Sequence, residues 1–211
     1  MPRLICARGI PLLPGWTALR FHPAAYYRAD KDAPRQSFPA LLAAVTDLSG
    51  CATAVHRTWL DPARPAKAPI GDPRRSLGRQ RGNGVRFGAA AGILVAGEGL
   101  ENTLSVLAAL PAMPAIAALS ANHLAALELP PVLQRLYVAL DPDPPGQSAF
   151  ERLRTRASAV DVRELRPTSG DFNDDLRALG LDALRAQLLA QLDPADRDRG
   201  LGDSRSVTDV E

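Results

Sequence analysis

The chain of 211 residues has few cysteines and no long hydrophobic segment. Its two cysteines, Cys6 and Cys51, are too few for a disulfide framework or for a four-ligand zinc site, and so low a count is typical of a reducing compartment. No apolar stretch reaches the roughly 18 residues that a membrane-spanning helix needs. Arg8 and several prolines interrupt the N-terminus, which is unlike a signal peptide. We therefore expect a cytoplasmic protein with no membrane partner.

Two other features are also lacking. The sequence contains no G-x-x-x-x-G-K-[ST] phosphate loop, which excludes an ATPase motor of that class. His22, His56 and His123 have no cysteine or second histidine at metal-ligand spacing, so we expect no zinc.

Lysine is scarce, since Lys31 and Lys67 are the only lysines among 25 cationic residues. Arginine, whose planar fork suits phosphate, carries almost all of the positive charge.

The charge is unevenly distributed along a chain of otherwise ordinary globular composition, with 46% hydrophobic and 23% charged residues. The formal net charge is only +2, but residues 56–86 contain eight basic and two acidic residues, and residues 87–211 contain 11 basic and 18 acidic residues. Two interpretations remain open. The basic segment is either a solvated loop beside an acidic domain, or a surface for a polyanion beside an acidic site that binds a divalent cation.

From residue 93 onward, apolar runs alternate with segments of helical periodicity. This alternation predicts an α/β domain built around a parallel sheet. The expected strands are 93–99, 115–119, 135–141 and 160–167, and the expected helices are 100–110, 122–129, 146–158, 172–180 and 182–192.

The first 92 residues are less regular. A DLSG turn predicts a hairpin whose first strand ends near Thr46 and whose second strand covers Ala54–Leu60. We expect residues 9–28 to form an irregular arm and residues 61–84 to form a loop rich in proline, arginine and glycine. The C-terminal end lacks apolar periodicity, which predicts a disordered tail. The expected organisation is therefore an N-terminal subdomain (1–92), an α/β domain (93–192) and the tail (193–211).

Acidic residues follow three of the predicted strands. Because the carboxyl ends of parallel strands meet at one edge of a sheet, where ligands bind in open α/β folds, we expect these carboxylates to lie close together. A single carboxylate at such a place is more often a helix cap, but three clusters at equivalent strand ends favour a site for a hard cation such as Mg²⁺. The residues are Glu98, Asp141, Asp143, Asp171, Asp174 and Asp175.

Three motifs resemble those of the Toprim family, the metal-dependent catalytic fold of bacterial-type primases, topoisomerases and some nucleases. They are GEGLENTLS (97–105), ALDPDPPGQSA (139–149) and GDFNDDL (170–176). Further upstream, residues 8–23, the segment VHRTWLDPARPAKAP (55–69) and the Gly/Arg-rich stretch before VRFG resemble the core of phage- and plasmid-type primases. The resemblance implies a Toprim-like parallel sheet flanked by helices, with a smaller N-terminal subdomain made of irregular segments and a β-hairpin.

The resemblance also implies a chemistry: Mg²⁺-dependent nucleotidyl transfer on a DNA template, as in RNA primer synthesis during replication of a mobile element. Glu98 would act as general base or as a metal-linked carboxylate. Asp141 and Asp143 would hold Mg²⁺ or Mn²⁺, and Asp171 or Asp174 would bind or orient a second ion. The implied partners are single-stranded DNA and NTPs.

Basic residues of the N-terminal subdomain are candidates for contacts with phosphate, although they are equally consistent with solvated loop charges. These residues are Arg57, Lys67, Arg74, Arg75, Arg79 and Arg81. Glu101 and Asn102, in the first turn of the helix after Glu98, are expected to be ordinary surface residues.

The chain departs from the primase pattern in two ways. It has no zinc-binding module and no helicase segment, which is consistent with a truncated gene, with a specialised relative, or with a split protein whose zinc module or helicase is a separate subunit. Pro142 also stands between the paired aspartates, where a polar residue is expected. Two alternatives therefore stay open: a Toprim nuclease that hydrolyses phosphodiesters, and a truncated, non-catalytic nucleic-acid-binding accessory protein.

Overall fold

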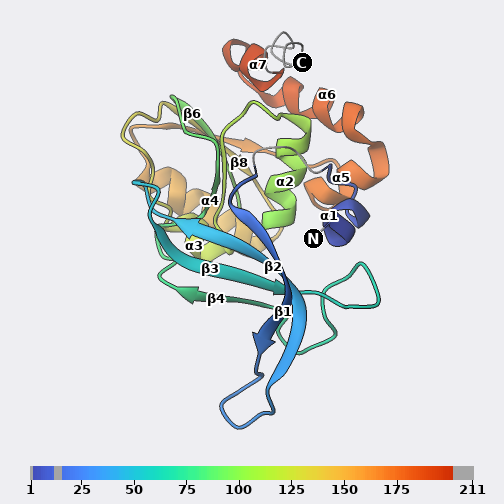
Figure 1. Cartoon of the computed structure of the whole chain (residues 1–211). Coiled ribbons are helices and arrows are strands. Elements are labelled where there is room, and N and C mark those ends of the chain that lie inside the picture. Colours follow the sequence, from blue (N-terminus) through green and yellow to red (C-terminus); the bar gives the residue numbers. More distant parts are fainter. Residues whose placement is uncertain (1, 12–15, 202–211) are drawn as a thin grey trace, which may run out of the picture.

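The computed structural model describes residues 2–11 and 16–201, which form two β-sheets (Figure 1). After a short helix, α1 (Pro2–Ala7), the first sheet is antiparallel and has the strand order β1-β2-β3-β4. Its strands are β1 (Leu19–Tyr27), β2 (Gln36–Thr46), β3 (Ala52–Trp59) and β4 (Arg74–Gly78). The expected DLSG turn joins β2 to β3, and Asp47 stabilises it by accepting the backbone N–H groups of Ser49 and Cys51.

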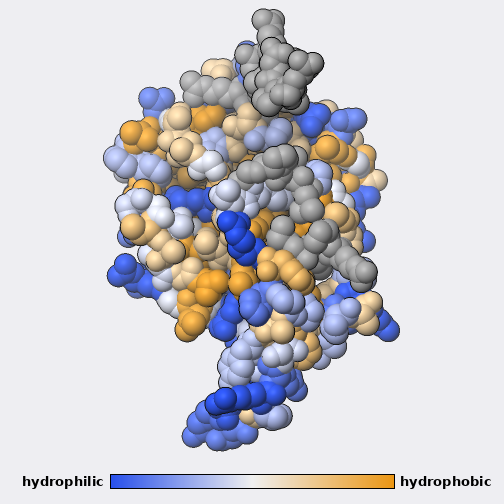
Figure 2. Space-filling view, viewed as in Figure 1, coloured by the Kyte–Doolittle hydropathy of each residue, from blue (hydrophilic) through white to orange (hydrophobic). Residues whose placement is uncertain are grey.

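Two of these strands correct the sequence interpretation. β1 lies in the expected irregular arm, and β4 lies in the expected loop 61–84. Both are edge strands with few buried side chains, so neither has the alternating apolar pattern that reveals a half-buried strand. The β1 register also shifts between His22 and Ala25, around Pro23. The turn after β1 projects from the molecule, and its surface is hydrophilic (Figure 2).

The second sheet has the order β5-β7-β6-β8-β9. Strands β6 to β9 are parallel, which confirms the predicted α/β class, and β5 adds an antiparallel edge. The strands are β5 (Val85–Phe87), β6 (Ile93–Gly97), β7 (Ala115–Ala117), β8 (Arg135–Ala139) and β9 (Asp161–Leu165). The helices are α2 (Leu100–Ala109), α3 (Ala121–Ala125), α4 (Pro144–Arg156), α5 (Phe172–Leu179) and α6 (Leu181–Gln191).

Both faces of the second sheet are covered, which explains why its central strands read as continuous apolar runs. In β6, Val95 belongs to a core shared with α2, α5 and α6, whereas Leu94 belongs to a core shared with α3 and α4. Figure 1 shows these helices on opposite sides of the sheet. The N-terminal sheet joins the first core through Leu41 and Val45 of β2, so the two sheets are packed together.

The C-terminal segment also differs from expectation. Residues 194–201 form helix α7 (Pro194–Leu201) rather than a disordered tail, while residues 202–211 lie outside the described residues. Asp196 anchors this helix, because its buried carboxylate accepts hydrogen bonds from Tyr137 Oη (2.7 Å) and Arg135 Nη1 (2.6 Å). In the described ranges, no helix has the length and hydrophobicity needed to cross a membrane.

Candidate functional site

The carboxyl ends of β6, β8 and β9 lie at the same edge of the second sheet, as their parallel register requires. This edge carries Glu98 directly after β6, Asp141 and Asp143 after β8, and Asp171 at the beginning of α5. These carboxylates are close enough to disfavour one another's ionisation. The structure therefore brings together acidic residues that are separated by as much as 73 positions in the sequence (171 − 98).

Glu98 is half-buried between β6 and α2. Its Oε2 is buried and has no hydrogen-bond partner among the described residues. Burial raises the pKa of Glu98, the charges of Asp141 and Asp143 raise it further, and the backbone N–H of Ala121 and the charge of Arg74 partly oppose the shift. An orphaned carboxylate oxygen with a raised pKa is suited to accept a proton or a cation.

Asp141 is held by Asn102, a residue that the sequence interpretation left on the surface. Asn102 is only 3% exposed, and its Nδ2 donates to Asp141 Oδ1 at 2.5 Å. Its Oδ1 accepts the backbone N–H of Phe172 at 2.9 Å, which ties Asp141 to the beginning of α5. Burial and the charge of Asp171 raise the pKa of Asp141 despite the hydrogen bond from Asn102.

Asp143 has a structural role as well as a place in the cluster. Its Oδ1 accepts the backbone N–H of Gly146 at 2.7 Å and caps α4, while its Oδ2 has no hydrogen bond to the described residues. A side chain at Gly146 would bring a Cβ within 2.6 Å of the Asp141 carbonyl oxygen, so only glycine allows this close turn. The D-P-D-P-P-G segment thus fixes both aspartates at the strand end.

The three aspartates after β9 differ in burial and in their hydrogen bonds. Asp171 caps α5 by accepting the backbone N–H of Asp174 at 2.8 Å, and Asp174 is exposed beside this cap. Asp175 is fully buried and accepts hydrogen bonds from Thr168, Ser169 and Gln187. Burial opposes its ionisation, but these hydrogen bonds outweigh that effect and lower its pKa. Asp175 therefore orders the loop and is not part of the candidate site.

Cations of the N-terminal subdomain approach this edge. Lys67 pairs with Glu101 at 3.0 Å, and Arg8 lies 3.8 Å from the other oxygen of the same carboxylate. Glu101 is therefore a partly buried link between the N-terminal subdomain and α2, and not the free surface carboxylate that we expected. Arg74 is exposed and close enough to Glu98 to lower its pKa.

The other predicted phosphate-binding residues are placed differently. Arg57 and Arg75 stack on aromatic rings, with each guanidinium carbon 4.9 Å from the ring centroid of Trp59 and Tyr27, respectively. Arg75 also donates to the carbonyl of Arg28 at 2.7 Å. Both side chains are thus engaged within the N-terminal sheet.

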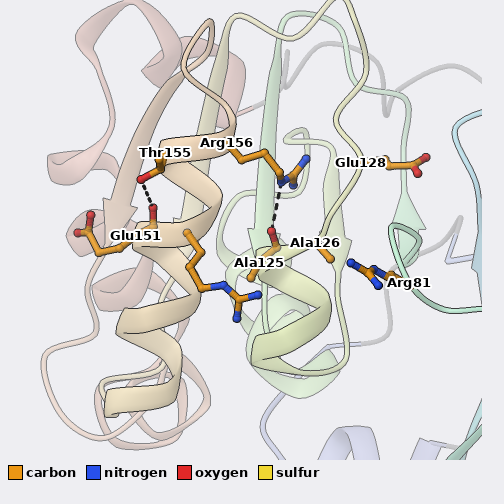
Figure 3. A pocket seen from close by; sticks show the side chains of 8 residues that line it. Arg81, Ala125, Ala126, Glu128, Glu151, Thr155 and Arg156 are labelled. Atoms are coloured by element: carbon orange, nitrogen blue, oxygen red, sulfur yellow. Dashed lines mark hydrogen bonds between the residues drawn. The ribbon is translucent and has the colours of Figure 1, made fainter.

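Arg79 and Arg81 lie in the segment between β4 and β5, and both are exposed. Arg81 lines a cavity beside α3 and α4 (Figure 3). The structure therefore does not bring all six predicted basic residues to one surface.

The donor set fits Mg²⁺ in type, because it consists of carboxylates and includes a buried oxygen without a partner. Within residues 2–11 and 16–201, no three His, Cys, Asp or Glu side chains converge closely enough to enclose a metal ion. Mg²⁺ does not require such a cage, since it usually keeps several waters and binds only one or two carboxylates. Glu98 and the Asp141–Asp143 pair are the residues that would hold it.

Two sequence-family models match the chain. One is a domain of unknown function, DUF7146, which matches residues 3–87, and the other is described as a Toprim domain and matches residues 93–182. A comparison with curated proteins found no match.

Solved primase structures share the fold at low sequence identity. The Aquifex aeolicus primase (zinc-binding and RNA polymerase domains) aligns with a TM-score of 0.60 and 15% identity, over 89% of this chain and 55% of that chain. The catalytic core of the Escherichia coli primase gives 0.58 and 14%, over 89% and 72%. The primase fragment of the bacteriophage T7 primase-helicase protein gives 0.55 and 15%, over 78% and 66%. The chain thus spans less than two thirds of the solved Aquifex and T7 primase chains.

Proposed function

Since residues 93–182 form a Toprim domain within a fold shared with bacterial and phage primase cores, we propose that the chain is a primase-like nucleotidyltransferase. It would extend an RNA primer on a single-stranded DNA template, using NTPs and Mg²⁺ or Mn²⁺, during replication of a mobile element. The observation that carries this proposal is the convergence of Glu98, Asp141 and Asp143 at one sheet edge, with raised pKa values at Glu98 and Asp141.

Each residue at this sheet edge has a separate role in the proposed reaction. Glu98, with its unpartnered Oε2, would accept the proton of the attacking 3′-hydroxyl or help to hold the cation. Asp141, fixed by Asn102, and Asp143, fixed as the cap of α4, would hold the cation. Mg²⁺, when bound, neutralises the triphosphate and stabilises the leaving pyrophosphate. Arg74, exposed near Glu98, binds the phosphates of the incoming nucleotide or of the template.

We expect the chain to start primers poorly without a partner. Initiation must hold a template, two nucleotides and a cation together, which is entropically unfavourable. The Aquifex relative carries a zinc-binding domain and the T7 relative is part of a primase-helicase protein. A zinc-binding or helicase partner would supply further template contacts here.

In the direct test, the purified chain is incubated with single-stranded DNA, labelled NTPs and Mg²⁺. Both primer synthesis and cleavage of the DNA are measured. A second reaction supplies a preformed primer, whose extension avoids the initiation step. Extension that depends on the divalent cation supports the proposal. Cleavage without extension would identify a Toprim nuclease instead, and DNA binding without either product would identify an accessory protein.

A further inference from the structure

A second group of arginines surrounds a cavity of about 640 Å³ between α3, α4 and the segment that joins β4 to β5. The cavity borders the second half of α4. Asp143 caps the beginning of this helix, and Arg152 lies nine residues further along, or roughly 13 Å at 1.5 Å per residue. The cavity is therefore distinct from the carboxylate site.

The basic and the acidic side chains that line this cavity point in different directions. Its lining includes Arg81, Arg152 and Arg156, together with Glu128 and Glu151. Figure 3 shows Arg81 and Arg156 reaching toward the cavity from opposite sides, while the carboxylates of Glu128 and Glu151 point away from it. The interior of the cavity is therefore more basic than the composition of its lining suggests.

Glu151 has another partner, and the charge of Glu128 acts on a cation that does not line the cavity. Glu151 forms an ion pair with Arg154 at 2.8 Å. Glu128 packs on Gly82, where an added Cβ would come within 2.9 Å of its Oε1, and its charge acts on Arg86. Among the described residues, Arg81 and Arg152 have no side-chain hydrogen bond and no ion pair. Two guanidinium groups without an ion pair among the described residues thus share one cavity.

The third arginine is held in place. Arg156 Nε donates to the carbonyl of Ala125 at 3.3 Å, and its Nη2 donates to the carbonyl of Leu127. These bonds fix the guanidinium at the end of α3 and leave Nη1 free of hydrogen bonds to the described residues. A group that is already ordered loses less conformational entropy when it binds a ligand.

We propose that this cavity is a second anion site, which binds phosphate groups from the backbone of a single-stranded nucleic acid. The guanidinium fork matches phosphate geometry, and converging cations that form no ion pair are stabilised by an anionic ligand. We assign these phosphates to a nucleic-acid backbone because Arg81 belongs to the basic segment 56–86, and this segment links the N-terminal sheet to the cavity. The site goes beyond the proposed polymerisation and does not depend on it.

The test measures binding of the full chain to fluorescein-labelled oligothymidylate by polarisation over a salt series. The Arg81→Ala/Arg152→Ala variant should bind about tenfold more weakly at low salt. Its plot of log K against log salt should be flatter by about 1.4, since each neutralised phosphate of a single strand contributes about 0.7. The matched control, Arg177→Ala/Arg197→Ala, removes two exposed arginines from α5 and α7 and should keep the wild-type slope. All four side chains are exposed, so thermal unfolding should be unchanged.

Inorganic pyrophosphate separates the two sources of phosphate. If the cavity variant loses pyrophosphate binding but keeps wild-type binding of oligothymidylate, the ligand is a small phosphate and the nucleic-acid source is overturned. If the cavity variant and the control bind both probes equally, the anion site itself is overturned. Because these readouts are binding equilibria, they stand whether or not the carboxylates catalyse polymerisation.

Discussion

The side-chain amide of Asn102 holds Asp141 in register with α5. Its Nδ2 donates to Asp141 Oδ1, and its Oδ1 accepts the N–H of Phe172, so a single neutral group satisfies an acceptor and a donor from two elements. A carboxylate at this position would still accept from Phe172 but would repel Asp141. The neutrality of residue 102 therefore limits the negative charge that gathers at the sheet edge.

Substitution of Asn102 should disturb both contacts. Asn102→Ala leaves the buried N–H of Phe172 without its partner and should lower the free energy of unfolding by about 1–3 kcal/mol, measured by urea denaturation. Asn102→Asp should be less stable at neutral pH than in mild acid. The two facing carboxyl groups would have raised pKa values in the folded state, so stability is lost as the pH rises through them. Asn122→Asp on the exposed part of α3 is the control. Wild-type stability of Asn102→Ala would contradict this role.

His56 should make the stability of the protein sensitive to mild acid. It is 8% exposed and contacts Ser76 Oγ through Nδ1, and burial together with the charges of Arg74 and Arg57 lowers its pKa to about 4. The unfolded chain takes up the proton near pH 6.5, so stability is complete above that pH and is lost as the pH falls toward 4. The loss should reach about 3 kcal/mol, because one pKa unit corresponds to about 1.4 kcal/mol.

The measurement is the free energy of unfolding as a function of pH in three proteins. Wild type and His22→Gln, which changes an exposed histidine, should show the same acid-dependent loss. His56→Gln should show a shallower dependence over this interval, whatever its absolute stability. Identical slopes in all three proteins would show that His56 does not remain neutral in the folded state.

The basic segment should separate into binding and structural arginines. Arg74 and Arg79 are exposed, so Arg74→Ala/Arg79→Ala should flatten the salt dependence of binding to single strands by about 1.4 with little change in stability. Arg75 stacks on Tyr27, so Arg75→Ala should lower the free energy of unfolding by about 1 kcal/mol. If Arg75→Ala flattened the salt dependence as strongly at unchanged stability, this division would be wrong.

Helix α7 should contribute to the stability of the domain through Asp196. Tyr137→Phe removes the hydroxyl that donates to Asp196 and accepts the N–H of Asp193 at 2.9 Å. Loss of these buried hydrogen bonds should cost about 1–3 kcal/mol of unfolding free energy, measured by urea denaturation. Asp198→Asn, an exposed change on the same helix, should have little effect. Equal stability of Tyr137→Phe and wild type would mean that α7 is not anchored in this way.

The sequence was informative where apolar patterns were strong. The strands β6 and β8 contain short apolar runs followed by acidic residues, and the regular alternation of strands and helices extends this pattern to β9. Both the parallel sheet and the grouping of Glu98, Asp141 and Asp171 could therefore be predicted. The edge strands β1 and β4 bury few side chains and could not be recognised by periodicity. Helix α7 was missed because it is anchored by a charged residue, Asp196, which has no hydrophobic signature.

Contacts between side chains that are far apart in the sequence could not be predicted from the sequence alone. Asn102 has an unremarkable place in its helix, and its role depends on Asp141 and Phe172, which follow 39 and 70 positions later. The ion pair between Lys67 and Glu101 likewise joins residues 34 positions apart. The GEGLEN motif indicated that polar residues lie at this edge of the sheet. Only the folded chain shows which side chains contact one another.

The most direct test of the account is incorporation of a single nucleotide onto a preformed primer, with Mg²⁺ and with the ion removed by chelation. We predict extension by the wild type that requires the cation, and a loss of about 10²-fold or more in Glu98→Gln and Asp141→Asn, the order of magnitude of a general base or metal ligand. Asp182→Asn, whose side chain is 97% exposed on α6, should extend the primer like the wild type. Extension that persists in Glu98→Gln and Asp141→Asn, or after chelation, would contradict the assignment of this sheet edge as the catalytic site.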